Sequence, residues 1–322
     1  MQMDSNEKRS YLTKVARLYY IEELSQREIA EQLAISVASV SRALSRAKEL
    51  EIVRIAIDEN QERIGEYEIS LQRQWNLTDC LLVPRCDTLG NTYREMAKRI
   101  TGLLARVLRR GDILGVSWGE TLKAISENAG ALGKDDITVV PIIGSMGEID
   151  TGIYPNSIAR ELAYRLGAQA YLFNTPAIVD NESIRNSLTE DSNYRKVRRI
   201  WDGLSAVLLS VSALNEDTSV FRSGIFAKQD LCTLRELGGA CATNFTILDQ
   251  EGTPIDAPIC RRIVNLPFED LRRVQHVIVA AAGPNKVRPL LSLLNTGLPT
   301  VLVTDMDTAE VLSQDSSNDP HQ

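Results

Sequence analysis

The first fifty residues place apolar side chains at the three- and four-residue spacing that is typical of amphipathic helices. Residues 7–23 predict one helix, and a shorter helix is predicted to begin after Ser25. Ser25 and Glu28 match a capping box, in which a hydroxyl and a carboxylate bond the free amides at a helix start. The apolar sides of the two helices consist of Leu12, Val15, Ala16, Leu18, Tyr19, Ile29, Ala30 and Leu33.

A third helix is predicted after a break in this pattern at residues 34–36, with Ser36 as its N-cap. The β-branched run Ile52–Ile57 follows this helix and predicts a strand or wing. Three helices, a short turn between the last two and a wing indicate a winged helix-turn-helix domain over residues 1–58. The predicted inner stripe of the third helix is Val37, Val40, Leu44, Ala47 and Leu50.

The outward side of the third helix carries small polar residues and arginines. Short Ser and Ala side chains allow a helix to approach DNA closely in a major groove about 12 Å wide. Arg42 and Arg46 are four residues apart, so they share a face and can reach phosphates or a guanine edge. The alternative is a solvated helix on a small helical bundle. We expect DNA contacts from Ser25, Gln26, Ser36, Ala38, Ser39, Ser41, Arg42, Ser45 and Arg46.

Residues 59–78 predict a charged linker helix with Ile64, either Ile69 or Leu71, and Trp75 on one side. Such a helix either pairs with a partner chain or connects two domains as a solvated element. At the other end of the chain, residues 314–322 form a polar tail that we expect to be disordered.

Residues 79–313 alternate short apolar runs with helical stretches, which is typical of a doubly wound, mostly parallel sheet with helices on both faces. This predicts an α/β domain. No G-x-G-x-x-G motif follows the first run, so a dinucleotide site lacks its main support. The strand candidates are residues 80–84, 112–117, 137–143, 168–173, 206–212, 245–249, 276–282 and 300–304.

Ligands bind such sheets at the carboxyl ends of the strands, where four turns of this chain carry suggestive residues. Small residues in these turns leave backbone amides exposed, and a helix start favours an anion such as phosphate. A carboxylate there can accept hydrogen bonds from sugar hydroxyls, and a lysine can offset phosphate charge. Each turn alone is more often only a turn and a helix cap, and it is the four turns together that point to a ligand site. The candidate effector-binding residues are Ser117, Gly119, Thr121, Gly144, Ser145, Asp249, Gly283 and Lys286.

Net charge, cysteine and histidine counts and the lengths of apolar runs restrict the classes of function that the chain can have. The net charge is −7, which excludes a chain that coats nucleic acid non-specifically, yet residues 1–57 are slightly basic. The five cysteines form no CxxC pair and only two histidines are present, so we expect no metal and no cofactor. No apolar run is long enough to span a membrane and the first ten residues lack a signal-peptide core, so we expect a cytoplasmic protein.

Four stretches of the chain resemble the SorC/DeoR-like family of sugar-responsive bacterial repressors. The stretch SQREIAEQLAISVASVSRAL resembles the family's helix-turn-helix line, and GDILGVSWGETL, NFTILDQEGTPI and GPNKVRPLLSLLNTGLPTVLVTDMDTAEVL resemble hallmarks of its effector domain. The resemblance covers roughly residues 10–58 and 80–313. It implies an effector domain similar in fold to sugar-phosphate isomerases, and a homodimer or homotetramer that binds palindromic double-stranded operators.

By the same resemblance, Ser117, Gly119, Thr121 and Lys286 match phosphate-contacting positions, and Asp249 matches a hydroxyl-contacting one. The implied effector is usually a phosphorylated sugar or a related small molecule, such as a sugar or a polyol. This chain departs from many relatives before Lys286 and in the loop that begins at Gly144. These departures disfavour a doubly phosphorylated effector and leave an unphosphorylated polyol open.

The predicted function is an effector-gated transcriptional regulator of a carbohydrate or polyol operon. One alternative is a sugar-phosphate isomerase or deaminase with an attached DNA-binding domain, for which Glu120, Asp249 and Asp305 are the candidate carboxylates. A DNA-binding scaffold without a ligand is a third class. Turnover of sugar phosphates would identify the enzyme, and thermal stabilisation by a sugar would exclude the scaffold.

Overall fold

The computed structural model describes residues 5–50, 52–53, 59–134, 136–145, 153–218, 221 and 226–314. The chain divides into two compact units, Met1–Gln61 and Glu62–Gln322. Each unit has its own hydrophobic core, so each is described by itself.

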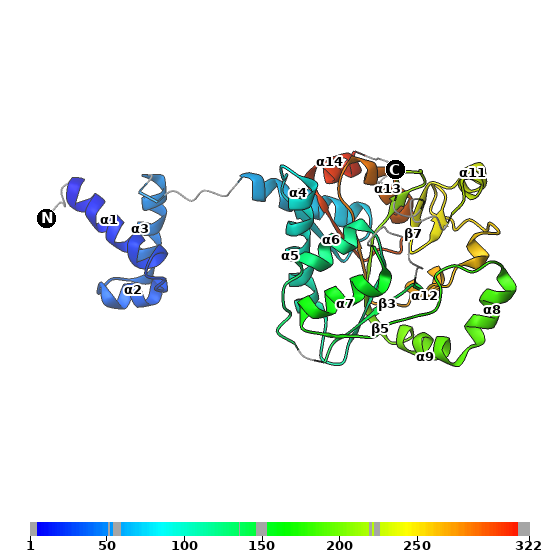
Figure 1. Cartoon of the computed structure of the whole chain (residues 1–322). Coiled ribbons are helices and arrows are strands. Elements are labelled where there is room, and N and C mark those ends of the chain that lie inside the picture. The colour runs from blue at the N-terminus through cyan, green and yellow to red at the C-terminus, as the bar shows by residue number, and fades with distance from the viewer. Residues whose placement is uncertain are drawn as a thin grey trace. The chain divides into compact units, whose positions relative to one another are not determined.

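The first unit is a three-helix domain made of α1 (Ser5–Tyr20), α2 (Gln26–Gln32) and α3 (Val37–Glu49), drawn in blue in Figure 1. Val15, Ile29, Val40 and Ala47 are buried at its centre. The predicted helix-turn-helix is confirmed, and both predicted caps are present. Ser25 and Glu28 exchange side-chain-to-backbone bonds of 2.8 and 3.3 Å, and Ser36 accepts a bond from the amide of Ser39.

The predicted inner stripe of α3 is correct at its centre and wrong at its ends. Val37 and Leu50 are 46% and 40% exposed, whereas Ala43 is buried. Val37 is the first residue of α3 and Leu50 is its C-cap, so both lie at the ends of the helix, away from the buried centre of the three-helix core. The wing predicted at Ile52–Ile57 falls mostly outside the described residues, as does the tail after Gln314. Ile52 and Val53 form a bend that packs against the three-helix core.

The second unit contains a seven-stranded sheet in which every neighbouring pair is parallel. The doubly wound α/β prediction is therefore confirmed. The order along the sheet is β1 (Asp79–Val83), β10 (Val301–Asp305), β9 (His276–Ala280), β5 (Leu204–Leu209), β2 (Ile113–Val116), β3 (Thr138–Pro141) and β4 (Gln169–Ala170).

Successive strand residues enter different cores, because side chains alternate between the faces of a sheet. In β5, Ala206 and Leu208 join one core, and Val207 and Leu209 join the other. The first core is covered by α5 (Leu89–Val107), α6 (Glu120–Asn128) and α7 (Pro155–Leu166). The second is covered by α4 (Glu59–Gln74), α9 (Ser192–Trp201), α13 (Val287–Asn295) and α14 (Met306–Ser313). The remaining α-helices of the described part of this unit are α8 (Glu182–Glu190), α11 (Lys228–Glu236) and α12 (Phe268–Leu271).

The segment predicted to be a main-sheet strand at residues 245–249 belongs instead to a small antiparallel sheet. This sheet consists of β6 (Ser212–Ala213), β7 (Cys241–Thr243) and β8 (Thr246–Leu248). A two-residue turn joins β7 to β8, and its residues Asn244 and Phe245 both have positive φ, 45° and 62°. Positive φ at both positions is what a tight hairpin turn requires.

Helix α4 occupies most of the predicted linker, 59–78, and from Glu62 onward it packs as part of the second unit. Its side chains Ile64 and Leu71 are buried in the second core together with Trp75. Glu68 accepts a bond from the amide of Leu82 in β1, at 2.9 Å. Burial raises the pKa of the Glu68 carboxyl, and the Leu82 amide opposes that shift.

Candidate functional site

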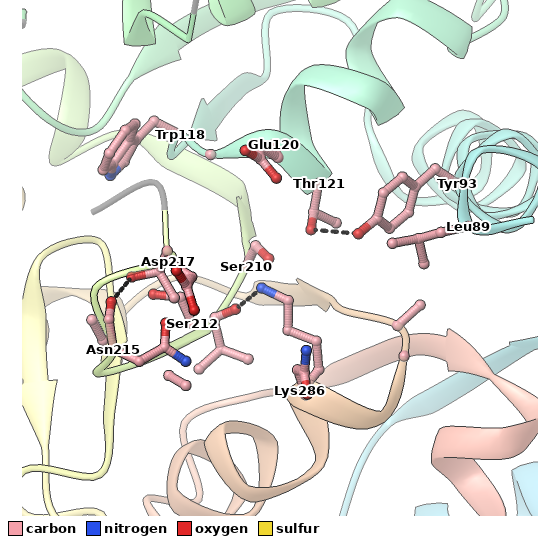
Figure 2. A pocket seen from close by; sticks show the side chains of 18 of the residues that line it. Leu89, Tyr93, Trp118, Glu120, Thr121, Ser210, Ser212, Asn215, Asp217 and Lys286 are labelled. Atoms are coloured by element: carbon pink, nitrogen blue, oxygen red, sulfur yellow. Dashed lines mark hydrogen bonds between the residues drawn. The ribbon is translucent and has the colours of Figure 1, made fainter. Parts of the chain in front are cut away.

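A cavity of about 300 Å³ opens at the carboxyl ends of β2, β5 and β9, which are adjacent in the sheet. Figure 2 shows the side chains that line it. The chain winds outward from β2 in one direction and from β5 in the other, so the cavity lies where the strand order reverses. Ligands of open α/β sheets bind at such switch points.

The start of α6 forms one wall of the pocket. Gly119 precedes the helix with φ 119°, a conformation that only glycine adopts readily, and it contributes no side-chain cap. Glu120 and Thr121 follow in the first turn and line the cavity. The Thr121 hydroxyl donates to the Tyr93 hydroxyl from α5 at 3.4 Å. Burial raises the pKa of Tyr93, so this phenol is neutral near neutral pH.

The segment after β5 forms a second wall, with Ser210, Ser212 and Asn215 among its lining residues. The Oγ of Ser212 and the Oδ1 of Asn215 are buried and have no hydrogen-bond partner among the residues that the structure describes. A buried polar atom without a partner is costly, so these two atoms suit a bound molecule with hydroxyl groups or ordered water. Sequence analysis missed Ser212 because it extended the strand to residue 212, whereas β5 ends at Leu209, and it considered no pocket residue in the segment that contains Asn215.

Lys286 reaches the pocket from the turn that follows β9. Its Nζ donates to the carbonyl oxygen of Val211 at 2.5 Å (Figure 2). Burial lowers the pKa of Lys286, and the negative charge of Glu120 acts in the opposite direction. Gly283 begins the same turn with φ 97°, and its amide donates to the Thr308 hydroxyl of α14 at 3.1 Å.

The tip of the β7–β8 hairpin closes the pocket from a third side. The ring of Phe245 stacks on Trp118 with centroids 4.9 Å apart, and Phe226 packs against it at 5.6 Å. These contacts hold Phe245 in its positive-φ conformation, which costs a non-glycine residue free energy. The Ser117 hydroxyl donates to Asn244 Oδ1 at 2.9 Å, so Ser117 lies directly behind the lining and orients Asn244.

The structure brings half of the predicted effector-binding residues together. Gly119, Thr121, Gly283 and Lys286 line the pocket, and Ser117 supports it from behind. The remaining predicted residues, Gly144, Ser145 and Asp249, do not line it.

Local structure explains the positions of two of those remaining residues. Gly144 lies so close to a neighbouring segment that a Cβ would meet the carbonyl oxygens of Thr175 and Pro176 at 2.6 Å. Asp249 accepts a 2.7 Å bond from the Thr253 amide within a turn. Both residues therefore have a role in the local backbone structure, and their predicted contact with an effector stays a prediction.

The three carboxylates considered for an enzyme do not converge. Glu120 lines the pocket. Asp249 accepts a hydrogen bond from the Thr253 amide within its own turn, and Asp305 accepts one from the Thr308 amide at the start of α14. Within the described part of the chain, no group of three or more His, Cys, Asp or Glu side chains is arranged to hold a metal ion. None of the helices in those same residues is long and apolar enough to cross a membrane.

The helix-turn-helix presents the second candidate site. Ala38, Ser41, Arg42, Ser45 and Arg46 are exposed on one side of α3. Two further candidates, Ser36 and Ser39, share a 2.8 Å hydrogen bond at the start of the same helix. Ser25 and Gln26 lie at the start of α2.

Both arginines of this face have partners on α3 itself. Arg42 donates to Ser39 at 3.1 Å, and Arg46 forms a 2.5 Å ion pair with Glu49. Both interactions are solvent-exposed, so a phosphate can replace them at small cost.

Comparisons with known proteins agree with a DNA-binding domain and a sugar-binding domain. A family model described as "Putative sugar-binding domain" matches residues 59–313, and a model of sigma-70 region 4 matches residues 17–50. The chain is similar to the sorbitol operon regulator of Klebsiella pneumoniae, 27% identical over 315 residues, which cover 96% of this chain and 99% of that protein. It is also similar to the deoxyribonucleoside regulator of Bacillus subtilis (strain 168), 26% identical over 313 residues, with coverage of 96% and 99%.

The fold is similar to a solved structure over almost its whole length. The crystal structure of the full-length sorbitol operon regulator from Klebsiella pneumoniae matches with a TM-score of 0.72 and 26% identity. The match covers 95% of this chain and 99% of that one. These relatives are regulators rather than enzymes.

Proposed function

This chain belongs to the SorC/DeoR family of sugar-binding transcriptional regulators, and we propose that a small polyhydroxy compound in the β2–β5–β9 pocket controls its operator affinity. The chain is a DNA-binding regulator with a sugar-binding effector domain, not an enzyme. The observation that supports the proposal best is the pocket's pair of unpartnered buried polar atoms, on Ser212 and Asn215. A ligand with hydroxyl groups supplies the partners that these atoms lack.

The proposed mechanism is thermodynamic linkage. A ligand that binds one arrangement of the protein more tightly shifts the population toward it, and operator affinity follows. We propose that a homodimer or homotetramer presents pairs of α3 helices to a palindromic operator, whose half-sites lie about 34–36 Å apart. Such a regulator works in the cytoplasm, where the chromosome lies.

The effector class follows from chemistry and from the names of the relatives. Those names mention sorbitol and deoxyribonucleosides, which are a sugar alcohol and compounds that contain a sugar. A cavity of about 300 Å³ lies at the small end of ligand pockets and suits a single sugar or polyol. We propose that the regulated genes serve the uptake or breakdown of such a compound.

A thermal-denaturation screen of the full-length protein tests this proposal. Sugars, polyols and their phosphates are added one at a time, because a ligand that binds only the folded protein raises its melting temperature. We expect one compound to stabilise the wild type but not Lys286→Met. Lys196→Met, which replaces an exposed lysine of α9, is the matched control and should keep the response. A response that persists in Lys286→Met would place the ligand elsewhere.

A further inference from the structure

The charges around the pocket are unfavourable for a phosphate. Among the described lining residues, Glu120 and Asp217 are acidic and Lys286 is the one cation. A phosphate monoester carries close to two negative charges at neutral pH, so it would meet a net negative charge among these described lining residues. A neutral molecule meets no such barrier.

Glu120 occupies the position at which α6 would otherwise attract an anion. It is the first residue of the helix, where a carboxylate interacts favourably with the helix dipole. A carboxylate here repels a second anion from the same helix end. Thr121, the next residue, has its hydroxyl bonded to Tyr93, so the two hydroxyls form a neutral polar pair on this wall.

Lys286 is also arranged for a neutral ligand. Its ammonium already donates to the Val211 carbonyl, and the residue is half-buried. A lysine has three donors, so two remain for hydroxyl oxygens of a ligand. Burial lowers the pKa of Lys286, which weakens its hold on the positive charge that a phosphate would require.

The wall formed by the segment after β5 carries polar atoms that suit hydroxyl groups of a ligand. Asn215 Oδ1 is a hydrogen-bond acceptor, and the Ser212 hydroxyl can donate or accept. A phosphate group that carries no proton has only acceptor oxygens, so Asn215 Oδ1 suits a hydroxyl group of the ligand and not a phosphate group. A polyol hydroxyl can donate to Asn215 and accept from Lys286. Figure 2 shows Ser212 and Lys286 on the side of the pocket that faces Glu120 and Thr121.

We propose that the pocket binds an uncharged polyol or unphosphorylated sugar, and that Glu120 is the residue that discriminates against its phosphate ester. The inference rests on the proposed function, because it names the ligand class of the same pocket. It reverses the phosphate-contacting role that family resemblance implies for Thr121 and Lys286.

Calorimetric titration of the full-length protein compares matched ligands. The neutral probes are sorbitol, mannitol and xylitol, and the charged probes are sorbitol 6-phosphate, mannitol 1-phosphate and inorganic phosphate. We expect a neutral polyol to bind at least about tenfold more tightly than its phosphate. Tighter binding of a phosphate ester, or of inorganic phosphate, overturns the inference but leaves the regulator function standing. Failure of every probe of both classes contradicts the proposed function as well.

A charge-neutral variant isolates the role of Glu120. Glu120→Gln keeps the shape of the side chain and removes its charge, so the preference for the neutral polyol should shrink by roughly tenfold. The phosphate ester should gain most of that change. Glu127→Gln, at an exposed position in the last turn of the same helix, should leave the preference unchanged. An unchanged preference in Glu120→Gln would remove Glu120 from the discriminating role.

Discussion

The polar side chains of the pocket differ in whether they have a hydrogen-bond partner within the described protein. Thr121 and Tyr93 share a hydrogen bond, and Ser117 is bonded to Asn244. Ser212 Oγ has no such partner. Paired groups hold the wall in place, whereas an unpaired group contributes to affinity when a ligand reaches it.

Replacement of Ser212 by alanine separates these two effects. Ser212→Ala should weaken effector binding about fivefold, because one hydrogen bond to the ligand is lost. The melting temperature of the ligand-free protein should stay equal or rise, since an unsatisfied hydroxyl is removed. Titration and thermal denaturation measure the two quantities. Ser187→Ala, at an exposed position of α8, is the control and should change neither. Full affinity in Ser212→Ala would contradict a ligand contact there.

The ion pair between Arg46 and Glu49 leads to a second prediction at the scale of residues, which concerns operator affinity. Arg46→Ala should weaken operator binding about tenfold, because a phosphate or base contact is lost. Glu49→Gln should strengthen binding by about twofold, since it releases Arg46 and removes a negative charge from the DNA-facing helix. Fluorescence anisotropy with operator DNA at several salt concentrations measures both. Arg110→Ala, an exposed arginine of the second unit, is the control. Equal affinities in all three variants would exclude α3 as the recognition helix.

At the scale of elements, the features that could be predicted from the sequence are those that depend on residues close together in the chain. The capping box at Ser25, the N-cap at Ser36 and the parallel strands follow from local patterns, and all are confirmed. The β7–β8 hairpin could not be predicted, because neither Asn244 nor Phe245 is glycine. Its turn depends on Trp118, which is more than a hundred residues away and stacks on Phe245.

Gly144 is a second case in which a contact between segments distant in sequence decides the role of a residue. Sequence analysis considered it a ligand-binding glycine, whereas the structure shows a close backbone approach. Gly144→Ala should therefore destabilise the second unit by about 2 kcal/mol, because a Cβ forces two segments apart. Chemical denaturation measures the loss. Gly102→Ala in α5, where a Cβ would meet nothing within 4 Å, should be neutral or stabilising. A stable Gly144→Ala that fails to bind the effector would restore the original assignment.

At the scale of the whole molecule, polar contacts connect the pocket to helix α4. The Gly283 amide at the pocket donates to Thr308 in α14. Glu310, one half-turn further along α14, pairs with Arg85 at 2.6 Å and with Arg63 of α4 at 3.0 Å. Helix α4 is the element of the second unit that lies nearest in sequence to the DNA-binding unit.

This connection predicts a variant that binds but does not respond. Glu310→Gln should keep effector affinity within about twofold, yet reduce the effector's influence on operator affinity by about threefold to tenfold. The coupling is the ratio of operator affinities with and without effector. Glu161→Gln, which breaks the exposed pair with Arg165 on α7, is the control. Unchanged coupling in Glu310→Gln would mean that α14 and α4 do not carry the signal.

The organisation of the chain into a helix-turn-helix and an α/β effector domain could be read from pattern and resemblance alone. The ligand could not, because its contacts come from turns after β2, β5 and β9 that only the fold brings together. Glu120 illustrates why the ligand contacts could not be predicted from the sequence. In the sequence it is one carboxylate after a strand, and only the cavity shows that it lies opposite Lys286.

The most direct test of the account is the affinity of the full-length protein for its operator, with and without the polyol identified by titration. Fluorescence anisotropy at fixed salt measures both values on the same DNA. Coupling between sites in regulators is typically 1–3 kcal/mol, so we predict a change of at least about fivefold. Lys286→Met should bind the operator as the wild type does and show no change. An operator affinity that stays the same at saturating polyol would contradict the central claim that this pocket controls DNA binding.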